Sequence, residues 1–319
     1  MSGSNRTLQL GLLGRDIQHS LSPHLQHLNA ECLGISVQYH LFDLKCHEAE
    51  QLLVRHRNSE SDQYGSTHPD LNDLDGLNIT TPYKELAFRM ADKLSGEAQA
   101  LKAVNTLTLR DGVISAHNTD PEGVIALLKG LNLADLCHRV ILIGTGGASR
   151  AAAFALAQSY DCREFVWISR DRERALKCME WCRERWPSIR CCWLSALENH
   201  QTRHSSLNST HLGEVIKEGI GLMISGAPPL TEAQWYSLEK LLRPHLGERF
   251  GFASEGYIID LNYGEERLRA VKEFAQSIGV YCSGGLRMLV GQGVASFNWW
   301  TGSTLNECAQ WSTFKKTLG

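Results

Sequence analysis

Lys84 and Asp120 are the residues of this chain whose types and surroundings best suit chemistry. Lys84 closes the polar run Asn78-Ile79-Thr80-Thr81-Pro82-Tyr83-Lys84, and Asp120 closes Asn118-Thr119-Asp120. A lysine ammonium beside a carboxylate can give a proton to an oxygen that gains negative charge, while Asn and Thr side chains bind the hydroxyls of a small polyol. Taken singly, each residue is better explained as a turn, cap or solvated helix residue, so the prediction depends on the motifs that come later in the chain.

A glycine-rich turn comes after Asp120. The apolar run Val140-Ile141-Leu142-Ile143 is typical of a buried parallel strand, and the alanine-rich segment 151–157 is typical of a helix. Between them lies Gly144-Thr145-Gly146-Gly147-Ala148-Ser149-Arg150. Such a turn lets the backbone approach a pyrophosphate, whose charge the amides at the helix N-terminus stabilise. The motif predicts a dinucleotide site, although Ser149 stands where the usual fingerprint has its third glycine.

Strand-like and helix-like runs alternate along the chain and must position these motifs. The runs are 8–13, 37–42, 49–54, 123–131, 165–168, 173–184, 221–224 and 257–260. The alternation predicts an α/β fold with a parallel sheet that helices cover on both faces. A chain of 319 residues commonly forms two domains, and a hydrophobic fraction of 43% is enough for two cores.

Composition excludes several classes of partner. The formal net charge of -3 provides no basic field for nucleic acid. No apolar run approaches the roughly 20 residues that a membrane helix needs. The segment 1–6 lacks the apolar core of a secretion signal, so we expect a cytoplasmic protein.

The ten cysteines do not predict a metal site or disulfides. Cys178 and Cys182 are four residues apart, and Cys191 adjoins Cys192, but the paired Cys-x-x-Cys spacing of a zinc site is missing. A cytoplasmic chain of this size does not need disulfides. We therefore expect reduced structural thiols and no metal, and the scattered histidines do not change this.

Taken in order, these motifs resemble the shikimate dehydrogenase family, whose members reduce 3-dehydroshikimate to shikimate with a nicotinamide cofactor. The resemblance runs nearly end to end. Ser20-Leu21-Ser22-Pro23 is similar to the family's Ser-x-Ser-Pro segment, and Gly285-Leu286-Arg287-Met288-Leu289-Val290-Gly291-Gln292 is similar to its closing helix. It implies that residues 1–122, completed by residues 287–319, form a substrate-binding catalytic domain. Residues 123–286 would form a Rossmann-type dinucleotide domain with a doubly wound parallel sheet.

The resemblance also implies roles for individual residues. Lys84 and Asp120 fall on the catalytic positions, where Lys84 protonates or stabilises the developing alkoxide. The substrate-binding positions are Ser20, Ser22, Asn78, Thr80, Asn105, Thr119 and Gln292. The cofactor-binding positions are Gly144, Gly146, Gly147, Ala148, Ser169, Arg170, Arg174, Tyr263, Gly285 and Met288. The expected partner is a small molecule, shikimate or 3-dehydroshikimate, bound by a monomer or homodimer.

The turn after the second strand of the nucleotide domain bears on the choice of cofactor. An acidic residue there usually binds an unphosphorylated ribose, whereas arginine accommodates a 2′-phosphate. The turn carries both kinds, with Asp171 between Arg170 and Arg174. Two guanidiniums outweigh one carboxylate if both face the phosphate, so we expect NADP, with NAD as the alternative.

Departures from the family pattern surround the nicotinamide side more than the polyol side. The segment 225–229 lacks the usual Asn-x-Thr/Ser, Gly284 replaces an Asp, and Arg287 replaces a small residue. Two alternatives to a shikimate dehydrogenase therefore stay open. One is a quinate or aminoshikimate-type dehydrogenase using NAD, and the other is a catalytically quiet regulator that binds a dinucleotide or metabolite. Retention of Lys84 and Asp120 favours an enzyme.

Overall fold

The computed structural model describes residues 6–57, 69–195, 221–242 and 256–318. The chain divides into two compact units. Unit 1 comprises Met1–Gly123 and Leu289–Gly319, and unit 2 comprises Val124–Met288. The divisions fall within helix α5 (Asp120–Gly130) and helix α11 (Leu286–Thr301).

Unit 1 is built on one mixed sheet with the strand order β2-β1-β3-β5-β6-β4. Its strands are β1 (Leu8–Gly14), β2 (Val37–Asp43), β3 (Gly76–Ile79), β4 (Lys93–Leu94), β5 (Thr106–Arg110) and β6 (Val113–His117). Its helices, besides parts of α5 and α11, are α1 (Ser22–Leu33), α2 (Cys46–Arg57), the 3-10 turn η1 (Leu71–Asp73), α3 (Lys84–Met90), α4 (Gly96–Leu101) and α12 (Glu307–Thr317).

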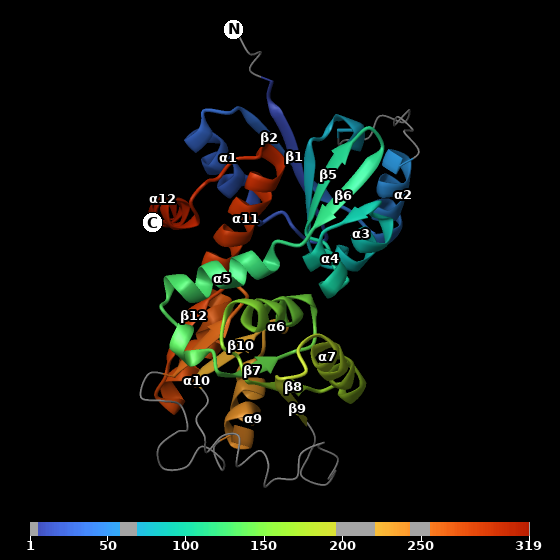
Figure 1. The fold of residues 1–319 in the computed structure, drawn as a ribbon. Helices are drawn as coiled ribbons and strands as arrows, with labels where there is room; N and C mark the ends of the chain where they lie inside the picture. The colour runs from blue at the N-terminus through green and yellow to red at the C-terminus, as the bar shows by residue number, and fades with distance from the viewer. Residues whose placement is uncertain (1–5, 58–68, 196–220, 243–255, 319) are drawn as a thin grey trace. The chain divides into compact units, whose positions relative to one another are not determined.

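Helices cover both faces of the unit 1 sheet. Figure 1 shows α1 and α11 on one side, and α2, α3 and α4 on the other. Successive side chains of a strand point to opposite faces. Leu10 of β1 accordingly packs against Phe297 and Trp300 of α11, whereas Leu13 joins the cluster that includes Leu53 and Leu86. Each face of the sheet thus has its own core.

Strand β5 runs antiparallel to both β3 and β6, so the sheet of unit 1 is mixed, whereas the parallel sheet was predicted for the dinucleotide domain. The reason is the two-residue turn at Asp111 and Gly112, whose φ angles are 51° and 72°. An Asp-Gly pair favours this hairpin turn because both positions need positive φ. As a result, the carboxyl ends of β1, β3 and β6 and the amino end of β5 meet at one edge of the sheet.

Unit 2 contains a wholly parallel sheet in the order β12-β11-β10-β7-β8-β9. Its strands are β7 (Arg139–Ile143), β8 (Glu164–Ser169), β9 (Arg190–Ser195), β10 (Leu222–Ser225), β11 (Tyr257–Asp260) and β12 (Tyr281–Gly284). Its helical elements, besides parts of α5 and α11, are η2 (Ala134–Leu136), α6 (Gly147–Ser159), α7 (Arg172–Arg185), α9 (Glu232–Leu242) and α10 (Glu265–Ile278). Numbered within the unit, this is the doubly wound Rossmann order. The predicted fold class is confirmed.

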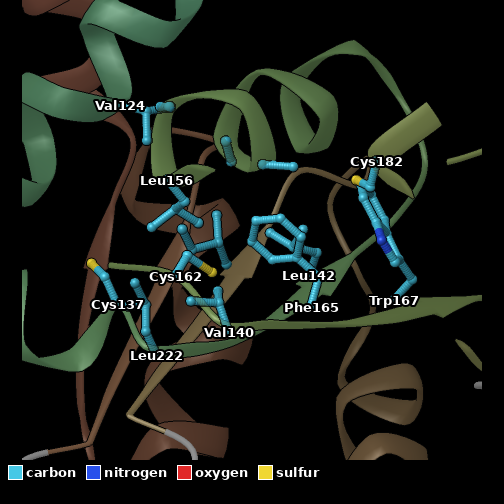
Figure 2. Close-up of a cluster of buried hydrophobic side chains, with 14 of the residues drawn as sticks. Val124, Cys137, Val140, Leu142, Leu156, Cys162, Phe165, Trp167, Cys182 and Leu222 are labelled. Atoms are coloured by element: carbon cyan, nitrogen blue, oxygen red, sulfur yellow. The ribbon is translucent and has the colours of Figure 1, made fainter. Parts of the chain in front are cut away.

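Alternation along the strands of unit 2 produces two cores. Val140 and Leu142 of β7 pack toward α6 and α7, together with Phe165 and Trp167 of β8, as Figure 2 shows. The intervening residue Ile141 packs on the opposite face, against α9 and α10. Burial on both faces explains why the strands of this sheet are continuously apolar.

Candidate active site

One edge of the unit 1 sheet gathers the polar motifs identified in the sequence. Asn78 lies near the carboxyl end of β3, Asn105 immediately precedes β5, and Thr119 follows β6. Asp120 begins α5 and Lys84 begins α3. The hairpin between β5 and β6 makes this possible, because it returns the chain to the edge at which β1 and β3 end.

The Lys84 ammonium contacts the Asp120 carboxylate directly. Lys84 Nζ donates to Asp120 Oδ2 at 2.5 Å. The Asp120 side chain is 2% exposed and that of Lys84 is 23% exposed, so the pair is largely shielded from water while the ammonium can still be reached. Asn105 Nδ2 donates to the other carboxylate oxygen at 2.9 Å, and the Asp120 amide donates to Asn118 Oδ1 at 3.0 Å. These bonds fix the carboxylate and thereby the direction of the ammonium.

Asn105 and Thr119 form a buried hydrogen-bonded pair that also contacts α11. Asn105 Oδ1 accepts the Thr119 amide at 2.8 Å, and Asn105 Nδ2 lies 3.3 Å from Gln292 Oε1. Thr119 Oγ1 donates to the Gln292 carbonyl at 3.1 Å. The structure therefore brings Gln292 of α11 together with residues that precede it by more than 170 positions.

Ser296 belongs to the same network, and the sequence analysis did not identify it. Its hydroxyl is buried and lies 3.1 Å from Asn78 Nδ2, 3.1 Å from Thr119 Oγ1 and 2.7 Å from Thr106 Oγ1. Ser296 is one helical turn beyond Gln292, and residues four apart lie on the same face of a helix. That spacing is the signal that could have identified it.

Ser20 and Ser22 lie at the start of α1 and connect to Asn78 through Tyr39. Ser20 Oγ accepts the Ser22 amide at 3.2 Å. Ser22 hydrogen-bonds to Tyr39, and the Tyr39 hydroxyl donates to Asn78 Oδ1 at 2.8 Å. Burial raises the pKa of the Tyr39 phenol, and the bond to Ser22 offsets part of that rise. Tyr39 therefore stays protonated at neutral pH and links the predicted carboxylate-binding serines to the predicted polyol-binding asparagine.

Thr80 lies at the same edge. Its amide donates to the Leu13 carbonyl at 2.9 Å, which extends the pairing of β1 with β3 by one residue. A Cβ on Gly14 would lie only 2.4 Å from the Thr80 methyl group. Gly14 thus leaves room for Thr80 beside the loop that leads to Ser20.

Unit 2 has a pocket with a volume of ≈ 420 Å³ at the carboxyl ends of β7, β8 and β10. Its lining combines the glycine turn after β7, the charged turn after β8, the segment 226–230 after β10 and two residues of α9, Gln234 and Leu238. β7 and β10 are the neighbouring strands at which the chain changes its direction across the sheet. Ligands of doubly wound folds bind at this switch point.

The glycine turn of this pocket fits a pyrophosphate. Gly144 has a φ of 91°, and a Cβ there would lie 3.1 Å from Ala227. A Cβ on Gly146 or Gly147 would meet no described atom within 4 Å, so open space lies beside both glycines at the N-terminus of α6. The structure compensates for Ser149 at the position of the third glycine. Its hydroxyl donates to the Ile143 carbonyl at 3.1 Å, and the close approach is made by Gly226, where a Cβ would lie 2.5 Å from Ser149 Oγ.

The charged turn after β8 has two arginines with different surroundings. Asp171 is the N-cap of α7, because its Oδ1 accepts the Arg174 amide at 3.0 Å. Its Oδ2 lies 3.3 Å from Arg174 Nε, so the same carboxylate also holds the guanidinium. Ser169 Oγ donates to the Asp171 carbonyl and accepts from the Asp171 amide, both at 3.1 Å. Arg170 is exposed and lines the pocket. The sequence suggested Asp171 as a ribose acceptor, but its role as the cap of α7 was not predicted.

Three of the remaining predicted cofactor residues, Tyr263, Gly285 and Met288, lie in or near the segment that leads from β11 to the start of α11. Gly285 packs so closely on the turn after β11 that a Cβ would lie 2.0 Å from the Leu261 carbonyl oxygen. Tyr263 follows the same turn. Met288 is 7% exposed and packs in the core of unit 2, so its contact with a cofactor stays a prediction. Ala148 lies in the first turn of α6.

Arg287, one of the departures from the family pattern, is accommodated by a glycine. Its Nε donates to the Ala126 carbonyl of α5 at 3.1 Å. A Cβ on Gly130 would lie 1.9 Å from the Arg287 guanidinium carbon. The bulky side chain therefore packs over the end of α5 rather than into the pocket, whose lining does not include it.

Within the described ranges, no group of three or more His, Cys, Asp or Glu side chains could hold a metal ion. All ten cysteines lie in those ranges and are free thiols. In the same part of the chain, no helix combines the length and apolar character needed to cross a membrane.

Two family models and a sequence relative match this chain. A family model for the shikimate dehydrogenase substrate-binding domain matches residues 12–107, and one for the shikimate 5′-dehydrogenase C-terminal domain matches residues 285–307. The shikimate dehydrogenase (NADP(+)) of Shewanella halifaxensis is 31% identical over 304 residues, which cover 93% of this chain and 91% of that protein. The chain belongs to the shikimate dehydrogenase family.

Solved structures of the family extend the similarity to the fold. Shikimate 5-dehydrogenase from Thermus thermophilus in complex with shikimate is 26% identical, with a TM-score of 0.69, covering 98% of this chain and 100% of that one. The same enzyme in complex with NADP(H) and shikimate is 25% identical, with a TM-score of 0.67, covering 95% and 97%. Members of the shikimate dehydrogenase family are oxidoreductases that act on a CH-OH group, so this chain is an enzyme of that class.

Proposed function

We propose that this chain is an NADP-dependent shikimate dehydrogenase that interconverts 3-dehydroshikimate and shikimate. Membership of the family supports the reaction, and the relatives' names support NADP as the cofactor. The observation that carries the proposal is the contact of Lys84 with Asp120, because the two residues come from different motifs and meet in one shielded site.

Unit 1 is proposed to bind the substrate. Ser20 and Ser22 provide two hydroxyls near the amino end of α1 for the substrate carboxylate. The amides and hydroxyls of Asn78, Asn105, Thr119 and Gln292, with Thr80 beside them, provide donors and acceptors for ring hydroxyls. A polyol suits this site because its walls offer both kinds of hydrogen-bonding group close together.

Lys84 is proposed to act on the oxygen whose charge changes. In reduction, the ketone oxygen becomes an alkoxide as the carbon accepts a hydride, and the ammonium gives that oxygen a proton. In oxidation, the same nitrogen takes the proton back. Asp120 keeps the ammonium in place without moving a proton itself. A fixed donor aimed at developing charge typically contributes on the order of 10²–10³-fold in rate.

Unit 2 is proposed to bind the dinucleotide, which when bound supplies or accepts the hydride. The N-terminus of α6, at Gly146, Gly147 and Ala148, suits the pyrophosphate, and Gly144 allows the turn. Ser169, Arg170 and Arg174 suit a 2′-phosphate on the adenosine ribose. Tyr263, Gly285 and Met288 are proposed on the nicotinamide side. The protein is further proposed to be cytoplasmic and either a monomer or a homodimer, which sedimentation would decide.

Steady-state kinetics with four substrate pairs tests the proposal. Shikimate and quinate are each oxidised with NADP and with NAD, and kcat/KM is compared. The proposal expects the highest value for shikimate with NADP. A highest value for quinate with NAD would assign the quinate alternative. Binding of shikimate and NADP without turnover would assign a quiet regulator.

A further inference from the structure

Ser296 occupies the centre of a side-chain network that no family motif identified. It lies in the interior of α11 among small and apolar residues, and it is 1% exposed. A ligand therefore cannot touch it. Its hydroxyl donates to the Gln292 carbonyl at 3.0 Å, in the helical pattern of a serine bonded to the preceding turn.

The same hydroxyl oxygen accepts a hydrogen bond from a distant part of unit 1. Asn78 Nδ2 donates to it at 3.1 Å, and the Thr106 hydroxyl lies 2.7 Å away. A hydroxyl has one hydrogen and two lone pairs. With its hydrogen on Gln292, the Ser296 oxygen accepts from Asn78. The Thr106 and Thr119 hydroxyls donate to Asn105 Oδ1 and to the Gln292 carbonyl, and their oxygens lie 2.7 and 3.1 Å from the Ser296 oxygen. The orientation of the Asn78 amide thus depends on Ser296.

The consequence is clearest for Asn78. One Nδ2 hydrogen goes to Ser296, and the other goes to the Asn105 carbonyl at 3.2 Å. Its Oδ1 accepts the Tyr39 hydroxyl at 2.8 Å and keeps a second lone pair. Both hydrogens are therefore committed to the protein, and the group left for a ligand is an acceptor.

We propose that Ser296 is a positioning residue that fixes the Asn78 amide so that Asn78 presents a hydrogen-bond acceptor, and not a donor, to a hydroxyl of the substrate. The proposal rests on the proposed function, since it deepens the role of the substrate site. It assigns to Ser296 a contribution to substrate affinity that acts through Asn78. Without the Ser296 hydroxyl, one Nδ2 hydrogen of Asn78 loses its partner, and the amide can rotate.

Kinetics of Ser296→Ala tests this assignment. The KM for shikimate should rise about 10-fold, as expected for the loss of one well-placed hydrogen bond. The kcat should stay within about threefold and the KM for NADP within about twofold, because Lys84 and the unit 2 pocket are unchanged. Ser296→Cys, which keeps a weak donor and acceptor of similar size, should give an intermediate KM. Thermal midpoints measured alongside show whether either variant is misfolded.

Ser312→Ala is the matched control. The Ser312 hydroxyl donates to the Cys308 carbonyl at 3.0 Å, the same four-residue pattern, on exposed α12 away from the network. Its KM values should equal those of the wild type. If Ser296→Ala also leaves the KM for shikimate within about twofold, or lowers kcat and raises both KM values together, the inference is wrong.

A double-mutant cycle with Asn78→Ala distinguishes an effect of Ser296 that acts through Asn78 from a general loss of order in the substrate site. If Ser296 acts through Asn78, adding Ser296→Ala to Asn78→Ala should raise the KM much less than it does in the wild type. Full additivity would contradict the inference. Failure of the proposed function looks different, because the wild type itself would then not oxidise shikimate with NADP.

Discussion

The unit 1 site consists of side chains that hydrogen-bond to one another. The part of the unit 2 pocket that is proposed for the pyrophosphate consists mainly of backbone. In unit 1, Asp120 and Asn105 are buried and each has several partners. In unit 2, the turn has open space beside Gly146, and Arg170 is exposed. One site depends on a dense polar network, and the other depends on the conformation of a turn and on exposed charge.

This difference teaches where substitutions should matter. A side chain removed from the unit 1 network leaves buried partners unsatisfied, which is costly. In unit 2, replacing an exposed arginine should affect the proposed contact with the cofactor and little else. Replacing a glycine of the turn by alanine, however, changes either the backbone or the space above it.

The largest expected effect is that of Lys84→Ala. Its kcat should fall by roughly 10²-fold or more with a smaller change in KM, because the ammonium is proposed to act mainly on the transition state. Steady-state kinetics with shikimate and NADP measures this. Lys177→Ala, which removes a lysine paired with Glu173 at 3.3 Å on the surface of α7, is the control and should be silent. Near-normal kcat in Lys84→Ala would remove Lys84 from the mechanism.

Two glycines of the unit 2 turn should respond differently to alanine. Gly146→Ala should keep wild-type stability, because its backbone conformation suits any residue, but NADP binding should weaken sharply because the methyl group fills the open space. Gly144→Ala should lose about 1–3 kcal/mol of stability through its positive φ. Thermal melts and calorimetric NADP titrations distinguish the two. Equal loss of stability in both variants would contradict the assignment.

Arg170→Ala should change the cofactor preference. A charge-assisted bond to a phosphate contributes on the order of 1.5–3 kcal/mol, so the KM for NADP should rise about 10- to 100-fold, and that for NAD should hardly change. Asp171→Ala should favour NADP by relieving repulsion. It should also lose about 0.5–2 kcal/mol of stability as the cap of α7 is removed. An unchanged NADP/NAD ratio in Arg170→Ala would mean that Asp171 governs the site.

His56 should make unit 1 sensitive to acid. Burial lowers the pKa of His56 below its ordinary 6.5, although Asn72, Asp70 and Asp92 oppose the shift. Because the folded protein disfavours the imidazolium, the neutral His56 ring contributes its full stability above the pKa of the unfolded state. That contribution is lost as the pH falls through the pKa of the folded state. Denaturant midpoints of the wild type should therefore fall more steeply below about pH 6.5 than those of His56→Gln. His27→Gln, on exposed α1 surface, is the control, and parallel curves for all three proteins would contradict the prediction.

The sequence predicted the elements and motifs that local pattern determines. The apolar run of β7 and the glycine turn after it were identified because strand, turn and helix signals adjoin. The hairpin of β5 and β6 was missed although Asp111 and Gly112 are a strong local signal, because neither of its strands was among the runs identified from the sequence.

The network around Ser296 could not be derived in the same way. Asn78 and Ser296 are 218 positions apart, so their contact depends on how α11 packs on the unit 1 sheet. The resemblance to the family indicated Gln292 but not Ser296 or Tyr39. Hydrogen-bond partners over such distances follow from tertiary packing, which a single sequence does not specify.

The central claim is that the two units divide the work, with the polar edge of unit 1 binding the substrate and the unit 2 pocket binding the dinucleotide. Calorimetric binding of shikimate and of NADP to Ser20→Ala/Ser22→Ala tests it most directly. The account predicts that affinity for shikimate falls by about 10-fold or more with the loss of two hydroxyls, while affinity for NADP stays within about twofold. Equal loss of both affinities, or unchanged binding of shikimate, would contradict it.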